Sequence, residues 1–181
     1  MRQRTSSFGR QNKEINMSMR NVGSNTSKSS LTNVQEDDVQ PNAIDLRLGK
    51  VLRVMSETFT IDETQKLHRG AEEVKVGQDG YWSLAPGAYE VVMENVVTVA
   101  DGEAGMVITR STLNRNGVYL TTGLYDSGYT GMMAAVMHVT TGYMRIKPGT
   151  RIGQYLCFDA ETLSMYDGDY GLGKEHDAKY S

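Results

Sequence analysis

Residues 123–146, GLYDSGYTGMMAAVMHVTTGYMRI, combine a glycine-rich turn, an apolar run, a second turn and another short apolar run. Short apolar runs separated by turn residues are typical of β-strands. We therefore predict one strand over Gly131–Val139 and another over Tyr143–Ile146, joined at the Thr141-Gly142 turn.

The same texture extends outward in both directions, from Gln40 to Phe158. Further strands are predicted over Ala43–Leu48, Lys50–Met55, Tyr81–Leu84, Ala88–Val99, Gly105–Thr109, Val118–Leu120 and Gln154–Phe158. Turn pairs that favour hairpins separate them: Pro86-Gly87, Asp101-Gly102, Asn116-Gly117, Thr141-Gly142 and Pro148-Gly149. Residues 61–75 are polar and fit either one helical turn or a loop. Many short strands at close spacing predict an all-β sandwich, barrel or jelly roll.

The totals suit a single globular domain with a tail. The chain has 181 residues, of which 39% are hydrophobic and 23% charged, with a net charge of −3. The sequence holds no apolar run near the roughly 20 residues of a membrane span and no apolar signal-peptide core, so we expect no membrane contact. The single cysteine, Cys157, fits a reducing cytosol and a buried filler, and we expect a cytoplasmic protein.

The first residues differ from this body. Residues 1–34 are rich in Ser, Thr and Asn, and carry six basic residues against Glu14 alone. Such a segment buries too little apolar surface to order itself. We therefore divide the chain into a polar basic arm over 1–39, a β domain over 40–160 and a Gly/Tyr tail over 161–181. Order in the arm would require a neighbouring subunit or another partner.

Several common chemistries are disfavoured. The three histidines, His68, His138 and His176, have no metal-ligand spacing and no cysteine partners. The sequence also contains no Walker-type phosphate loop, no dinucleotide fingerprint and no nucleophile elbow.

Polar residues instead gather at four turns between apolar strands, where a rigid scaffold presents them. In chain order these are residues 42–49 with Asp45, residues 109–117 with two arginines and two hydroxyls, residues 121–131 with Asp126, and residues 147–154. Each alone fits a surface turn or a structural ion pair.

Together and in this order, the four segments resemble four of the five motifs of the trimeric dUTPases and dCTP deaminases. The resemblance runs from about Pro41 to Phe158 and is strongest over residues 123–131 and 147–154. It implies a dUTPase-like distorted jelly roll, or β-clip barrel, assembled as a homotrimer with active sites between subunits.

One position separates the two activities of this family. In the deaminases that this chain resembles, a glutamate five residues after the glycine that closes the third motif moves protons during attack on cytosine. Here that glycine is Gly131 and the fifth residue is Val136, which cannot transfer a proton. The resemblance therefore implies dUTP diphosphatase activity, although Ser111–Arg115 and Ile44–Gly49 look deaminase-like.

The resemblance also implies roles in dUTP hydrolysis. Asp126 would orient the attacking water, Gly123 and Tyr125 would lie against the uracil, and Tyr129 would pack under the deoxyribose. The candidate phosphate contacts are Arg110, Ser111, Thr112, Arg115 and Gln154.

Two further roles concern the metal and the tail. Mg²⁺ would be held largely by the triphosphate, with Asp45 supporting its water shell. Tyr170 is the candidate lid aromatic, with Tyr180 as the alternative, and Lys174 is a candidate phosphate contact. The usual arginine of the fifth motif is missing from this tail.

Two alternatives stay open from the sequence. One is a dCTP deaminase, alone or bifunctional, and the other is a non-catalytic structural or particle-decoration trimer. The odd tail and deaminase-like form suit a phage-encoded enzyme working in the host cytoplasm.

Overall fold

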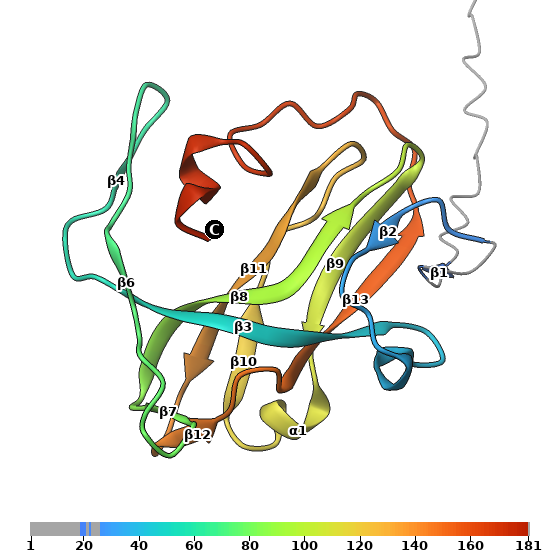
Figure 1. The fold of residues 1–181 in the computed structure, drawn as a ribbon. Helices are drawn as coiled ribbons and strands as arrows, with labels where there is room; N and C mark the ends of the chain where they lie inside the picture. Colours follow the sequence, from blue (N-terminus) through green and yellow to red (C-terminus); the bar gives the residue numbers. More distant parts are fainter. Residues whose placement is uncertain (1–18, 21, 23–25, 181) are drawn as a thin grey trace, which may run out of the picture.

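A computed structural model describes residues 19–20, 22 and 26–180, and these residues form mainly β-strands (Figure 1). The strands are β1 (Met19–Arg20), β2 (Ser30–Leu31), β3 (Ile44–Val54), β4 (Thr60–Ile61), β5 (Lys66–Leu67), β6 (Ala71–Glu73), β7 (Trp82–Leu84), β8 (Gly87–Thr98), β9 (Glu103–Thr109), β10 (Val118–Thr121), β11 (Thr130–Val139), β12 (Met144–Ile146) and β13 (Arg151–Asp159). The helical elements are short: η1 (Glu36–Asp38), α1 (Ser111–Asn114) and η2 (Glu175–Tyr180). The all-β prediction is confirmed.

β11 shows why these residues form strands. Its residues alternate between buried and half-buried along the whole strand, so Met133 and Met137 point into the core while Met132 and Val136 lie on the other face. This period of two matches a pleated strand with one face in the core. The apolar run predicted from the sequence is therefore a strand packed on both sides to different degrees.

The main sheet has the strand order β1-β13-β3-β8-β11-β10, with β2 and β6 added at β8 and β3, and β9 added at β13. Its antiparallel strands curl around one core (Figure 1). The two strands predicted over 43–48 and 50–55 are a single strand, β3, with a register shift between Leu48 and Lys50. A bulge at Gly49 therefore interrupts the ladder without ending the strand.

The predicted turns lie between strands, but most of them do not close hairpins. β9 pairs with β13 instead of the preceding β8, and β12 pairs with β7 instead of β11. Among the described strands, sequential neighbours that do pair are β4 with β5 and β10 with β11. Turn residues reverse the chain, whereas the buried faces of the whole sheet select the partner strand. The predicted hairpin of residues 131–146 was therefore wrong in its pairing.

Residues 61–75 fit either a helical turn or a loop in the sequence; in the structure they form no helical turn and alternate between short strands and loop. They carry β5 and β6, and β6 pairs with β3. Figure 1 shows this region projecting beside the C-terminal segment.

The core lies between the curled strands and includes fully buried side chains from β3, β7, β8, β11 and β13. The largest of these are Tyr155, Ile44, Leu46, Leu48, Leu84, Met93, Met133, Met137 and Ile152. Cys157 is also buried, and burial raises the pKa of its thiol to about 11. The expectation of a buried cysteine is confirmed.

The arm was expected to need a second chain for order. Of its described residues, β2 pairs with β8 and β1 pairs with β13 of the same chain. These segments therefore take their order from the body of their own subunit, while residues 1–18 of the predicted arm lie outside the described residues. Among the described residues, no helix is long and apolar enough to cross a membrane.

Candidate active site

The loop between β10 and β11 holds Asp126 at the surface. Tyr125, the residue before it, exchanges two backbone hydrogen bonds with Gly105 of β9, at 2.7 and 2.9 Å. Two residues after it, the amide of Gly128 donates to the carbonyl of Val99 at 2.9 Å. Asp126 itself is exposed. The loop is therefore tied to the sheet on both sides of a carboxylate that faces solvent.

A cavity of about 310 Å³ opens beside this loop. Its lining is largely aromatic and draws on the loop, on β11 and on the tail. The lining residues are Gly123, Leu124, Tyr125, Tyr129, Met132, Ala134, Tyr166, Tyr170, Asp177 and Tyr180. We call this the aromatic cavity. Four predicted substrate contacts, at positions 123, 125, 129 and 170, thus lie around one space.

The two loop tyrosines are fixed and neutral. The hydroxyl of Tyr125 donates to the carbonyl of Ala134, and that of Tyr129 donates to the carbonyl of Met132, both at 3.2 Å. Burial raises the pKa of both phenols above their ordinary value. Their rings therefore supply rigid apolar walls with no charge at neutral pH.

Asp126 lines a second, larger cavity of about 460 Å³. Ser127 and the tail segment 160–167 form the other walls of this space. The carboxylate thus lies at the edge of the loop, beside the aromatic cavity and not inside it.

A basic cluster occupies the other end of β9, where α1 begins. Arg110 precedes α1, and both Ser111 and Thr112 are exposed on its single turn. Arg115 follows the turn and is also exposed. This arrangement presents guanidinium and hydroxyl donors together, as a phosphate site requires.

Asp45 of β3 pairs with Arg110 of this cluster and is fully buried. The side-chain amide of Gln154 donates to its Oδ1 at 3.0 Å. Its Oδ2 lies 3.4 Å from a guanidinium nitrogen of Arg110 and 3.6 Å from one of Arg151. Asp45 therefore neutralises and orients two arginines at the edge of the site.

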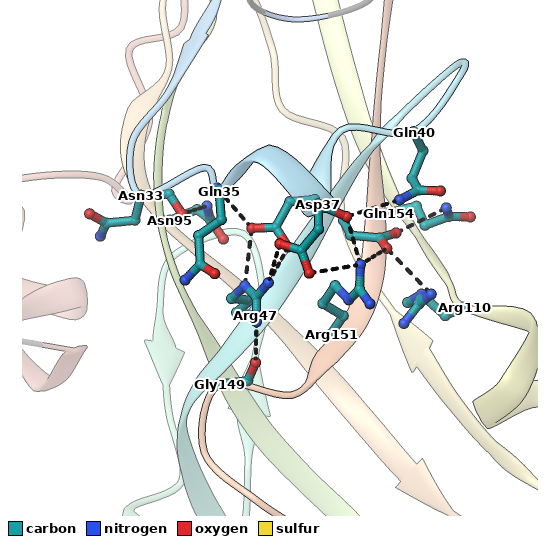
Figure 2. A network of polar contacts seen from close by, with 12 residues as sticks. Asn33, Gln35, Asp37, Gln40, Arg47, Asn95, Arg110, Gly149, Arg151 and Gln154 are labelled. Atoms are coloured by element: carbon teal, nitrogen blue, oxygen red, sulfur yellow. Dashed lines mark hydrogen bonds and ion pairs between the residues drawn. The ribbon is translucent and has the colours of Figure 1, made fainter.

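A second acidic group continues the network toward η1. Burial opposes the charged form of Asp38, but hydrogen bonds from Arg47 and Gln35 outweigh it and hold the pKa of Asp38 below its usual range. Arg151 also donates to the carbonyl of Asp37 at 2.6 Å. Figure 2 shows these arginines converging on the acidic residues. The network anchors η1 to β3 and β13.

The donor set fits Mg²⁺ only with help from a ligand. Among the described residues, no group of three or more His, Cys, Asp or Glu side chains is placed to hold a metal ion. Oδ2 of Asp45 is buried and accepts no hydrogen bond from a described residue, yet two guanidinium groups face it. An oxygen in this setting suits hydrogen bonding to a metal's water better than direct coordination.

Within one chain the two halves of the site lie apart. Gly105, which pairs with Tyr125, and Arg110 are five residues apart along β9. At roughly 3.3 Å per strand residue, this separation is about 16 Å. Figure 1 shows α1 and the β10–β11 loop toward opposite ends of the sheet. The structure thus brings the predicted site residues into two groups rather than one.

Some residues of these groups were missed in the sequence. Tyr166 and Asp177 line the aromatic cavity, and Arg151 joins the Asp45 network. Tyr180 is buried, and its hydroxyl donates to Glu90 of β8. Lys174 lies away from the basic cluster, in an open pocket with His68 and His176. The tail sequence shows no strand-like or helix-like alternation of apolar residues, so the contacts of its residues could not be predicted from the sequence.

The curled β domain thus presents an aromatic cavity, an exposed carboxylate and an arginine-rich turn. A family model described as dCTP deaminase-like matches residues 12–160. The chain belongs to the dUTPase/dCTP deaminase family.

Two relatives illustrate the likeness. The chain is 30% identical over 152 residues to "Deoxyuridine 5'-triphosphate nucleotidohydrolase" of Methanocaldococcus jannaschii, covering 82% of this chain and 97% of the relative. It is 32% identical over 135 residues to "Probable deoxyuridine 5'-triphosphate nucleotidohydrolase" of Aeropyrum pernix, covering 73% of this chain and 84% of the relative.

A solved structure supports the fold. The 2'-deoxycytidine 5'-triphosphate deaminase of Agrobacterium tumefaciens superposes with a TM-score of 0.56 and 20% sequence identity. The match covers 74% of this chain but only 43% of that one. The shared part is therefore the β domain described above.

Proposed function

We propose that this protein hydrolyses dUTP to dUMP and pyrophosphate, with Mg²⁺ bound to the triphosphate. The observation that carries the proposal is the exposed Asp126, held by the backbone pairs of Tyr125 and Gly128 beside the aromatic cavity. The names of the two relatives support the same reaction for a chain of this family.

Asp126 orients the water that attacks the α-phosphate of dUTP. A carboxylate accepts the water's proton as the new P–O bond forms and the bond to the β-phosphate breaks. Pyrophosphate leaves, and the proton is released to solvent. The exposed position of Asp126 leaves its oxygens available for this water.

Uracil enters the aromatic cavity. The backbone around Gly123, which lines this cavity, hydrogen-bonds the base, and a base with a different donor and acceptor pattern leaves these groups unpaired. The ring of Tyr129 packs under the deoxyribose, where a 2′-hydroxyl would lose its water without gaining a partner. Tyr170 closes the cavity from the tail.

The triphosphate binds at the basic cluster. Arg110 and Arg115 bind phosphate oxygens, Ser111 and Thr112 donate hydroxyl hydrogen bonds, and Gln154 completes the set. Mg²⁺ held by the triphosphate would supply positive charge against the charge that develops on the phosphates. Asp45 fixes Arg110 and would accept a hydrogen bond from water of the metal's shell.

A complete site then needs two or more chains. The β10–β11 loop, which carries Asp126, and α1, which Arg110 precedes, lie toward opposite ends of the sheet (Figure 1). Met106 and Ile108 expose apolar side chains on the outer face of β9, at 40% and 41% of their surface. Burying this face against another copy in a homotrimer would bring the two groups together.

Deamination of dCTP is disfavoured. Val136 offers no titratable group on β11, and proton transfer is essential to that reaction. A non-catalytic trimer would turn over no nucleotide. The proposal and the two alternatives are therefore distinguished by the products: dUMP from dUTP, dUTP from dCTP, or none.

The test is a pyrophosphate-release screen with dUTP, dCTP, dTTP, dATP and dGTP in the presence of Mg²⁺. We expect turnover of dUTP, with kcat falling about 10²- to 10⁴-fold in Asp126→Asn. Asp101→Asn changes an exposed aspartate in the β8–β9 turn and is the matched control. Formation of dUTP from dCTP, or turnover that survives in Asp126→Asn, contradicts the proposal.

Subunit complementation tests the shared site. Asp126→Asn and Arg110→Ala chains are each inactive alone. Random mixed trimers regain about a quarter of the wild-type activity if each site takes Asp126 from one chain and Arg110 from another. If mixing restores no activity, Asp126 and Arg110 of the same chain act in one site, and the shared-site proposal is wrong.

A further inference from the structure

Glu103, the first residue of β9, carries a buried carboxylate that the reaction above does not use. Only 4% of its surface is exposed. Its carboxylate accepts hydrogen bonds from the hydroxyls of Ser27 and Ser29, at 2.8 and 2.5 Å, and from the amides of Lys28 and Ser29, at 2.9 and 3.0 Å. Four donors from one segment of three residues thus converge on a single side chain.

Among the described residues, no cationic side chain forms an ion pair with this carboxylate. The thiol of Cys157 also contacts this carboxylate, with its sulfur 3.4 Å from Oε2. The guanidinium of Arg20 hydrogen-bonds Asp159 and interacts with Glu103 only through its charge. A buried carboxylate without donors is costly, so residues 27–29 and Glu103 hold each other in place.

The same residue is tied to the loop that carries Asp126. The hydroxyl of Ser127, the residue after Asp126, donates to the backbone carbonyl of Glu103 at 2.6 Å and contacts the hydroxyl of Thr162 at 2.7 Å. Ser127 is itself buried. Two residues further along β9, Gly105 pairs with Tyr125. Both neighbours of Asp126 therefore depend on the backbone position at the start of β9.

We propose that Glu103 is a positioning residue for Asp126, through which residues 27–29 set the geometry of the catalytic loop. The side chain fixes the N-terminal segment, and the backbone of the same residue fixes the loop. This inference rests on the proposed hydrolysis at Asp126 for its kinetic consequence, but its structural consequence is independent of any activity.

The structural consequence is measured first, by amide hydrogen exchange on the full chain. In Glu103→Gln one carboxylate oxygen becomes an amide that cannot accept a hydrogen bond. Ser29→Ala removes one donor and leaves Glu103 intact. We expect faster exchange in residues 122–129 in both variants, with residues 111–117 unchanged.

Glu72→Gln is the matched control, because Glu72 is an exposed glutamate on the short strand β6. Unchanged exchange in residues 122–129 of both test variants overturns the inference, as does a uniform increase across the sheet. These outcomes do not depend on whether the protein hydrolyses dUTP.

The kinetic consequence is a fall in kcat. Misplacing a catalytic group by a fraction of an ångström to an ångström lowers rates by about 10- to 100-fold. We expect such a fall in Glu103→Gln at temperatures well below unfolding, with KM for dUTP changed less than threefold because the aromatic cavity and the basic cluster are untouched.

Ser29→Ala should lower kcat in the same direction, and the double variant should lose less than the product of the two single effects. A KM effect alone, or full independence of the two substitutions, contradicts the positioning role. If the wild-type chain has no dUTP turnover, the proposed function fails while the exchange result still decides the link between residues 27–29 and the loop.

Discussion

Val136 of β11 lies directly opposite Glu90 of β8 in the antiparallel ladder. Glu90 is half-buried, and its carboxylate accepts hydrogen bonds from the ammonium group of Lys179, at 2.9 Å, and from the hydroxyl of Tyr180. The position where a deaminase of this family carries a glutamate thus faces a carboxylate already bound to the tail.

Val136→Glu should therefore destabilise the protein without creating a deaminase. Like charges directly opposite in a sheet cost about 1 kcal/mol, and Val136→Gln gives the cost of polarity alone. We expect the difference between these two variants in urea unfolding at pH 8 to shrink as the pH falls and the carboxyls are protonated. Val136 is also absent from the described lining of the aromatic cavity. Conversion of dCTP to dUTP by Val136→Glu would contradict this account.

Acid stability should depend on Glu103. Burial opposes its charged form, but the hydrogen bonds from Ser29, Lys28 and Ser27 outweigh it and lower the pKa to about 2. The unfolded value is about 4.3, so the carboxylate stabilises the fold fully above that pH and loses its contribution as the pH falls toward 2. At neutral pH, ionised Glu103 therefore contributes at most about 3 kcal/mol to the free energy of unfolding.

The measurement is urea unfolding between pH 2 and 6. The wild-type free energy of unfolding should fall more steeply with acid than that of Glu103→Gln, since the amide does not titrate. Parallel curves for the two proteins would show that Glu103 contributes nothing to the loss of stability in acid.

The strands were predictable from sequence because each carries its own signal. The alternation along β11 and the apolar runs of β8 and β13 reflect which side chains meet the core. Their partners were not predictable, because Thr141 and Gly142 specify only a reversal of direction. That β12 pairs with β7 depends on faces that become buried only when the sheet curls.

The site divides in the same way. Asp126 and Arg110 stand in motifs whose order along the chain is visible in the sequence, so their chemistry could be predicted from the set of segments taken together. Their separation along β9 follows from the ladder of Gly105 with Tyr125, which no local pattern encodes. Asp177 lines the aromatic cavity from a tail without periodicity, so only the fold reveals it.

Gly128 should be required for activity as well as for stability. Its φ of 88° is unfavourable for a side chain, and an added Cβ would lie 2.9 Å from Cε of Met165 and 3.2 Å from the amide of Tyr166. Gly128→Ala should cost about 1–2 kcal/mol for the backbone alone and displace the loop beside Asp126.

The control is Gly142→Ala in the turn after β11. Its φ is 61°, and nothing lies within 4 Å of the added Cβ, so it carries backbone strain of the same kind far from the loop. We expect both variants to lose stability in thermal unfolding but only Gly128→Ala to lose kcat. Equal effects on kcat would mean that the loop geometry does not control the reaction.

The apolar face of β9 should hold the oligomer together. Met106 is 40% exposed and lies opposite Leu156 of β13, so a charge there would meet apolar surface in any copy packed on this face. Met106→Glu should shift light-scattering mass toward the monomer and remove dUTP turnover, because a single chain does not bring Asp126 and Arg110 together. Ile61→Glu places the same charge on β4, where Ile61 is 60% exposed, and should leave mass and turnover unchanged. A monomeric Met106→Glu with full turnover would show that one chain forms a complete site.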